Sequence, residues 1–191
     1  TDVTEGGATD TFTLVFNTRP VGGGATVTLS GVGVTVSPSS LTFNGSNWDS
    51  VRTITVTAID DPIIETSPHA GSVSFTVTSG GDYNGFPITP VDVNITDNDI
   101  ASVTLSKTTA SVTEGGAGDT YTVVLNTQPP SDITITLTHG SEITVTPTTL
   151  IFTNTNWNVA QTVTVAAVND FIDETSPHSG GNISHVASDV G

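Results

Sequence analysis

The sequence predicts an all-β chain that holds two partial copies of one antiparallel sandwich unit. Three observations lead to this prediction. Short segments alternate apolar and polar residues with a period of two, no segment has a helical period, and a set of motifs occurs twice at a fixed spacing. Thr, Val, Ile and Ser dominate the alternating segments, and β-branched residues favour strands over helices.

The repeat has the size of a domain. The motif VTEGGA begins at Val3 and again at Val112, which is an offset of 109 residues. A constant period of this length indicates two copies of a small domain rather than a solenoid of short repeats. The same offset relates four further pairs: Asn17 with Asn126, Leu41 with Leu150, Trp48 with Trp157, and Glu65 with Glu174.

The alternation places the strands in chain order. In the first copy it predicts strands at residues 11–16, 26–29, 34–36, 53–58, 73–77 and 91–95. In the second copy it predicts strands at residues 102–105, 120–125, 133–137, 143–145 and 162–166. A complete unit then has about seven strands with turn signals every ~8–12 residues, which is typical of a β-sandwich.

Neither copy is complete within these 191 residues. The second copy opens with residues 100–110, which have no counterpart before Thr1, and the first closes with residues 83–99, which have no counterpart after Gly191. We therefore expect a first repeat at 1–99 without its first strand and a second at 100–191 without its last. Two explanations stay open here: the boundaries of a longer chain, or neighbouring chains that exchange strands and polymerise head to tail.

The charge excludes several function classes. The chain has 19 acidic and three basic residues, a net charge of -16, and no Cys. Such a charge argues against nucleic acid and anionic membrane surfaces as partners, and fits bound cations or a self-repelling soluble surface. The absence of an apolar run of about 18 residues argues against membrane insertion. No catalytic Ser-His-Asp set repeats and no Gly-rich loop precedes a helix, so we expect no enzyme.

Acidic residues gather at three places where strands end. The first place is Glu5, with Glu114 as its second copy; the third is the closing Asp97-Asn98-Asp99. Calcium prefers about six to eight oxygen ligands, and carboxylates packed together without a cation repel one another. Asp-rich turns are also ordinary turn chemistry, but their recurrence predicts a bound divalent cation. The remaining place, which is second in chain order, is the run Asp60, Asp61 and Glu65. Its counterpart in the second copy is Asn169, Asp170, Asp173 and Glu174.

The ordered set T-E-G-G, T-F-x-x-x-x-W, D-D-x-x-x-E and closing D-N-D resembles the Calx-beta domain. This family is named from the sodium–calcium exchangers and is frequent as tandem repeats in large bacterial surface proteins. The resemblance covers the whole chain. It implies a tandem pair of immunoglobulin-like, seven-stranded antiparallel sandwiches that bind calcium at one end.

The resemblance also nominates calcium ligands, and it does so unequally in the two copies. Asn169 stands where the first copy has Asp60, and the closing D-N-D has no second copy within the chain. We therefore expect calcium in the first repeat and a weaker or empty site in the second. The nominated residues are Glu5, Asp60, Asp61, Glu65, Asp97 and Asp99 in the first copy and Glu114, Asp170 and Glu174 in the second.

Two other repeated residue types are expected to be structural. Trp48 and Trp157 each follow an Asn-rich turn, where a single aromatic residue usually anchors a core or its rim. His69 and His178 lie in identical Ser-Pro-His turns without the neighbouring His or Cys residues that a zinc site needs. We expect both histidines to shape their loops.

The expected function is a non-catalytic repeat of an extracellular or cell-surface stalk, adhesin or filament. No linker separates Asp99 from the second copy, so a cation held by Asp97 and Asp99 would stiffen this junction. Neighbouring copies of the same repeat or chain are the expected partners. The alternative is a module that binds carbohydrate or surface glycans through loops such as 22–24 or 80–85.

Overall fold

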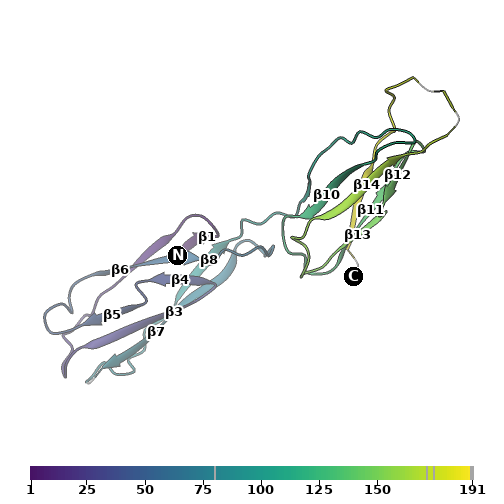
Figure 1. Cartoon of the computed structure of the whole chain (residues 1–191). Helices are drawn as coiled ribbons and strands as arrows, with labels where there is room; N and C mark the ends of the chain where they lie inside the picture. Colours follow the sequence, from purple (N-terminus) through teal and green to yellow (C-terminus); the bar gives the residue numbers. More distant parts are fainter. Residues whose placement is uncertain (80, 171, 174, 190–191) are drawn as a thin grey trace. The chain divides into compact units, whose positions relative to one another are not determined.

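Figure 1 shows the computed structural model of the chain, which describes residues 1–79, 81–170, 172–173 and 175–189. Every regular element among these residues is a β-strand, so the all-β prediction is confirmed. The described part of the chain contains no helix with the length and apolar character that a membrane span requires. The chain divides into two compact units, Thr1–Asp61 with Glu65–Asn98 and Pro62–Ile64 with Asp99–Gly191.

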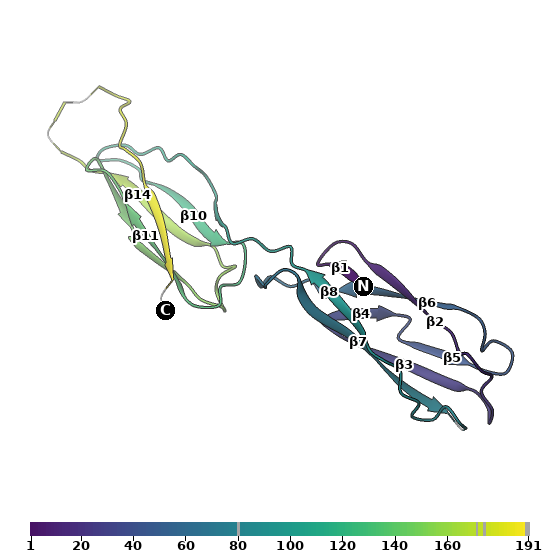
Figure 2. The same ribbon diagram turned by 180° about the vertical axis from the view of Figure 1, so that it is seen from behind.

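The first unit contains two sheets. One has the strand order β1-β8-β7-β3-β5 and the other β2-β6-β4. All neighbouring strands run antiparallel except β1 and β8, which run parallel and lie side by side in Figures 1 and 2. The strands are β1 (Asp2–Thr4), β2 (Asp10–Leu14), β3 (Ala25–Val32), β4 (Val34–Ser37), β5 (Ser40–Phe43), β6 (Arg52–Ala58), β7 (His69–Ser79) and β8 (Val91–Thr96).

The second unit also contains two sheets, with the orders β12-β14-β10-β9 and β13-β11-β15. Neighbouring strands in both sheets run antiparallel. Its strands are β9 (Val103–Leu105), β10 (Asp119–Leu125), β11 (Ile133–Thr138), β12 (Ile143–Thr146), β13 (Thr149–Phe152), β14 (Gln161–Ala167) and β15 (Ser184–Asp189).

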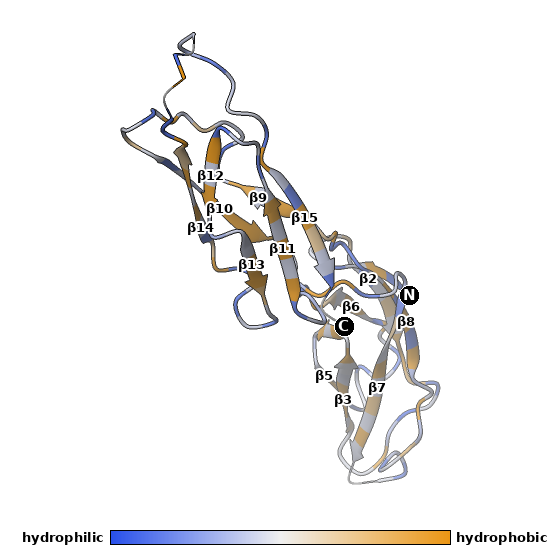
Figure 3. Cartoon of the chain, turned by 90° about the vertical axis from the view of Figure 1, so that its right-hand side faces the viewer, coloured by the Kyte–Doolittle hydropathy of each residue, from blue (hydrophilic) through white to orange (hydrophobic). Residues whose placement is uncertain are grey.

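Each unit has its own apolar core, formed by the inward residues of the alternating strands. Val27, Phe43 and Ile54 are fully buried in the first core, and Phe152 and Val163 in the second. Since consecutive side chains of a strand point to opposite faces, one face of each sheet enters the core and the other is polar. Figure 3 shows this alternation of apolar and polar residues along β7 and β11. The observed layers fit a β-sandwich, while the count of about seven strands in a complete unit stays a prediction.

The two tryptophans lie at the rims of these cores. Trp48 and Trp157 are partly buried and pack against the first and second cores respectively. The carbonyl oxygen of Trp48 accepts a hydrogen bond from the Phe16 amide at 3.1 Å, and that of Trp157 accepts one from the Leu125 amide at 3.1 Å. Both tryptophans therefore play the same anchoring part in their units.

The strand pairing is the same in both units, but the lengths differ at two places. The pairing β2-β6-β4 corresponds to β10-β14-β12, and β7-β3-β5 corresponds to β15-β11-β13. β2 ends at Leu14, whereas β10 continues to Leu125. β7 begins at His69, whereas β15 begins only at Ser184. These differences occur where one unit has a strand, β8 or β9, that the described residues of the other do not contain.

Candidate metal centre

The turn after β1 points Glu5 into the first unit. The Glu5 amide donates a hydrogen bond to the Thr96 carbonyl at the end of β8 (3.0 Å), and the turn closes with a bond from the Gly7 amide to the Thr4 carbonyl (3.1 Å). Gly6 has a φ of 57°, and a Cβ there would lie 2.9 Å from Nδ2 of Asn98. This close approach and left-handed backbone explain the glycine in the Glu-Gly-Gly motif.

Glu5 is a buried carboxylate with an unsatisfied oxygen. The residue is 3% exposed, and its Oε2 atom is buried without a hydrogen-bond partner. Burial raises the pKa of Glu5 most, and the negative charges of Asp61, Glu65 and Asp97 raise it further. An unpaired charge in such a place is costly unless a cation or proton neutralises it.

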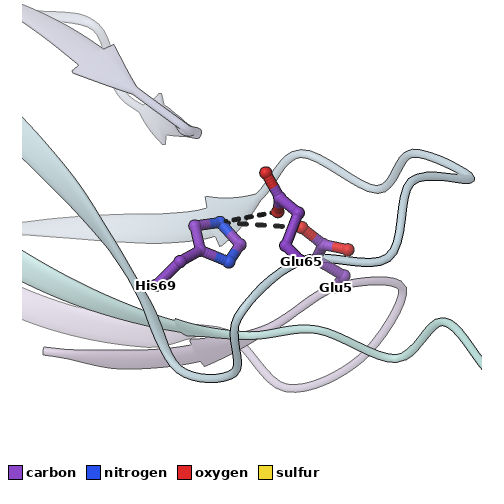
Figure 4. Close-up of side chains that lie close together, drawn as sticks. All are labelled: Glu5, Glu65 and His69. Atoms are coloured by element: carbon purple, nitrogen blue, oxygen red, sulfur yellow. Dashed lines mark ion pairs between the residues drawn. The ribbon is translucent and has the colours of Figure 1, made fainter. Parts of the chain in front are cut away.

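His69 lies beside Glu5 at the start of β7, as Figure 4 shows. Its Nε2 atom is 3.1 Å from Oε2 of Glu65 and 3.9 Å from Oε1 of Glu5. Its Nδ1 atom is buried without a hydrogen-bond partner. The imidazole is therefore part of the acidic cluster and does more than shape the loop, which differs from the expectation for the Ser-Pro-His turn.

The closing segment after β8 links the other two acidic segments. Oδ2 of Asp97 accepts a hydrogen bond from the Glu65 amide at 2.8 Å. Nδ2 of Asn98 donates to the Glu5 carbonyl at 2.9 Å and to Oδ1 of Asp60 at 3.1 Å. Asn98 thus connects the turn after β1 with the loop that begins at Asp60. The sequence prediction did not include Asn98, although it lies between two predicted ligands.

Potential ligand atoms of the first unit form two overlapping groups. Glu5, Glu65 and His69 form one and Glu5 and Asp97 the other, with the atoms of each group within 4.8 Å of one another. Three of the six residues predicted for the first repeat therefore come together within the unit. Asp60 bonds to Asn98, Asp61 is near enough for its charge to affect the Glu5 pKa, and Asp99 belongs to the second compact unit.

This donor set fits a hard divalent cation. Calcium takes oxygen ligands at about 2.3–2.6 Å, and carboxylates are its usual charged ligands. The buried, unsatisfied Oε2 atom of Glu5 is the oxygen that would gain most from such an ion. His69 would then lie beside the ion and hold Glu65, because calcium does not favour imidazole nitrogen.

The second repeat places its predicted ligands differently. Glu114 is partly buried, and Oδ1 of Asp170 accepts a hydrogen bond from the Ile172 amide at 2.8 Å within its own loop. Asn169 is exposed, and Glu174 lies outside the described residues. Neither ligand group found among the described residues includes Glu114 or Asp170.

Comparison with known proteins yields weak structural likenesses, of which two are described here. No family model matches the chain, and no curated protein matches it. The crystal structure of calcium-binding domain CBD12 of CALX1.1 matches with a TM-score of 0.38 and 16% identity over 86% of this chain and 71% of that one. The crystal structure of the E. coli chaperone DraB matches with a TM-score of 0.38 and 10% identity over 99% of this chain and 94% of that one.

Proposed function

We propose that this chain is a non-catalytic, calcium-binding structural repeat of an extracellular stalk, adhesin or filament. One observation carries the proposal: the buried Glu5 carboxylate, with its Oε2 atom unsatisfied, lies among the carboxylates of Glu65 and Asp97. This arrangement is unfavourable without a cation and favourable with one.

The electrostatics favour a divalent ion over a basic side chain. Two like charges about 4 Å apart repel by roughly 4 kcal/mol at an effective dielectric constant of about 20. The whole chain has only three Lys and Arg residues, and His69 carries a positive charge only when it is protonated. Calcium supplies two positive charges and accepts several oxygen ligands at once.

The same ion would join segments that are far apart in the sequence. Its ligands come from the turn after β1, the loop before β7 and the segment after β8. A cation that binds all three restrains β1 and β8 together. We propose that this restraint stiffens the repeat and its direct junction with the next one, and that neighbouring repeats are its partners.

Calcium-dependent unfolding of the first unit tests this proposal. Each unit contains one tryptophan, so Trp157→Phe leaves Trp48 as a fluorescent reporter of the first unit, and Trp48→Phe leaves Trp157 as a reporter of the second. We expect calcium at about 100 times its Kd to stabilise the first unit by ~3 kcal/mol, with little change in the second. Magnesium and EDTA serve as controls.

Small-angle X-ray scattering with calcium and with chelator tests the stiffening. We expect a narrower distribution of end-to-end distances with calcium. An unchanged melting temperature at Trp48 would contradict calcium binding, and an unchanged scattering profile would contradict stiffening alone.

The alternative function, binding of carbohydrate or surface glycans, has one observation in its favour. Tyr83 and Phe86 lie 5.7 Å apart between ring centroids, next to an open cavity of about 490 Å³. Aromatic side chains of this kind offer flat apolar surface to a ligand. A glycan array with a Phe86→Ala control would identify such binding.

A further inference from the structure

The first unit contains a group of three side chains, Glu5, Glu65 and His69, in which an imidazole joins two carboxylates. We infer that this group binds a borderline transition ion such as zinc, with His69 as a direct ligand. The inference goes beyond the proposed function, because calcium binding as proposed above does not use the imidazole. The two ideas share Glu5 and Glu65 and are tested separately.

The mixture of donor atoms favours such an ion. Calcium and magnesium prefer oxygen ligands, whereas zinc binds imidazole nitrogen as readily as carboxylate oxygen. Sites with three protein ligands and one water molecule are common for zinc. Glu65 and His69 are partly exposed, so water can reach the fourth position. The fold thus supplies two carboxylates in place of the neighbouring His or Cys residues that the sequence lacks.

The distances between the donor atoms are close to those of a zinc site. Figure 4 shows that the His69 ring lies beside both carboxylates. Its Nε2 atom is 3.1 Å from Oε2 of Glu65 and 3.9 Å from Oε1 of Glu5. With bonds of about 2.0–2.2 Å, neighbouring ligand atoms of a tetrahedral zinc ion are about 3.3–3.6 Å apart. The observed distances lie on either side of this range, so small movements of the side chains would place an ion between them.

Backbone contacts position all three side chains. His69 begins β7, which pairs with β8. The Glu5 amide donates to the Thr96 carbonyl at the end of β8, and the Glu65 amide donates to Oδ2 of Asp97 at 2.8 Å. All three residues are therefore held by β8 or by the residue that follows it. Such positioning lowers the entropic cost of bringing the ligands together around an ion.

A metal ion satisfies the buried carboxylate better than protonation of the imidazole does. A protonated His69 would pair with Glu65 and approach Oε1 of Glu5. It would leave Oε2 of Glu5, which is buried and has no hydrogen-bond partner among the described residues, as it is. A carboxylate can bind one ion through both of its oxygens. An ion between Glu5 and Nε2 of His69 would therefore satisfy both oxygens at once.

The sequence repeat supports the imidazole as a ligand. The three residues recur at the repeat offset as Glu114, Glu174 and His178, whereas Asp60 is replaced by Asn169. Glu114 and His178 line the same cavity of the second unit. Calcium binding alone gives no reason for a histidine at this position in both copies. The inference concerns the first unit, where the structure describes all three residues.

Zinc and calcium should compete for the first unit. Glu5 belongs to both groups of ligand atoms, with Glu65 and His69 in one and with Asp97 in the other. Two divalent ions that use the same carboxylate repel each other strongly at such short range. Bound zinc should therefore raise the calcium concentration that is needed to stabilise the unit. An unchanged calcium requirement would contradict the shared use of Glu5.

NMR of the imidazole nitrogens in the full chain tests the ligation directly. The chain has four histidines, and single His→Gln variants assign their ring resonances. We expect zinc to shift Nε2 of His69 much more than Nδ1, because only the ligated nitrogen donates its electron pair to the ion. Calcium should leave the ring resonances of His69 nearly unchanged. A histidine with a purely structural role would not distinguish the two ions in this way.

Two variants separate the ions in calorimetric titrations. His69→Gln should weaken zinc binding by about 100-fold or more, since loss of even an outer partner of a metal site typically costs about 10–100-fold. It should keep the calcium response at Trp48. Asp97→Asn keeps an oxygen that can accept the Glu65 amide but removes the charge, so it should weaken calcium binding more than zinc binding. His139→Gln, at an exposed histidine of the second unit, is the matched control and should change neither.

The outcomes separate this inference from the proposed function. Zinc that does not shift Nε2 of His69, or that binds His69→Gln and the unchanged chain equally well, would overturn the inference, whatever calcium does. Loss of both ions in His69→Gln would also overturn it, because His69 would then maintain the fold of the cluster and would not select one ion. Zinc bound at His69 without any calcium response would support the inference and contradict the proposed function.

Discussion

The two units keep the same strand pairing but differ where their acidic side chains gather. In the first unit β8 brings Asp97 to Glu5, which is buried and has an unsatisfied oxygen. In the second unit Glu114 is only partly buried and lines an open cavity. The strands that the two units share therefore do not bring the carboxylates of the candidate metal centre together. This arrangement also requires β8 and the segment that follows it.

A second difference lies inside the cores. In the first unit Phe12 and Phe75 meet edge to face, with ring centroids 5.9 Å apart. In the second unit His185 pairs with Leu137 as Phe75 pairs with Leu29 in the first; Tyr121 and His185 meet edge to face at 5.6 Å, and their Oη and Nε2 atoms form a 2.7 Å hydrogen bond. The same geometry is thus held by an apolar pair in one unit and by a polar, titratable pair in the other.

Removal of the Ile95 side chain should have the largest effect, because it makes the first unit resemble the second. Ile95→Ala should destabilise the first unit by about 2–5 kcal/mol through the lost burial and the cavity left behind, and weaken calcium binding with it. Denaturant unfolding followed at Trp48 measures the change. Ile151→Ala, at a position 53% exposed in the second unit, is the control and should change stability by less than ~0.5 kcal/mol.

Neutralising the buried glutamate should have the next largest effect. Glu5→Gln keeps the shape of the side chain but removes the charge, so it should abolish the calcium-dependent stabilisation of ~3 kcal/mol expected for the first unit. Calorimetric titration with calcium and unfolding at Trp48 measure this loss. Glu114→Gln is the matched control in the second unit; if both variants lost the response equally, the proposed inequality of the two repeats would be wrong.

The polar pair should make the second unit sensitive to pH. Burial lowers the pKa of His185 from its ordinary value of 6.5, so the folded unit holds the neutral form. As the pH falls below about 6.5, the unfolded chain takes up a proton that the folded unit resists, and stability decreases. Unfolding followed at Trp157 between pH 7.5 and 5 should show this decrease, and His185→Phe, which copies Phe75, should remove it.

The smallest expected effect concerns two aspartates at corresponding positions. Lys107, with backbone hydrogen bonds from Ser111 and Thr120, lowers the pKa of Asp119 to about 2, whereas the pKa of Asp10 is lowered mainly by backbone hydrogen bonds and by no lysine. Lys107→Gln should therefore raise the pKa of Asp119 toward that of Asp10, as measured by NMR titration. Because its folded pKa is depressed, Asp119 contributes stability above pH 3.8 that is lost as the pH falls toward 2. An unchanged pKa would show that the backbone bonds alone set it.

Much of this organisation could be predicted from the sequence, because it is periodic. The alternation located most strands, and the repeat located the acidic segments. It did not predict the three-residue β1 or the four-residue β5 and β13, which are short, or β15, where residues 184–189 show little alternation. His69 and Asn98 were missed because only the fold shows which segments are neighbours. The Ser-Pro-His turn occurs in both copies, and this recurrence was the one sequence feature that could have pointed to a role for His69.

The parallel pair β1–β8 has a consequence for how the first unit forms. Glu5 and Asp97 are far apart in the sequence, so their contact closes a long loop. Contacts of such high sequence separation tend to form late in folding, because the entropy of loop closure opposes them. During synthesis the cluster cannot assemble until the closing strand has emerged. A cation bound at Glu5 would therefore bind fully only after β8 has joined the unit, and would hold together segments that are far apart in the sequence.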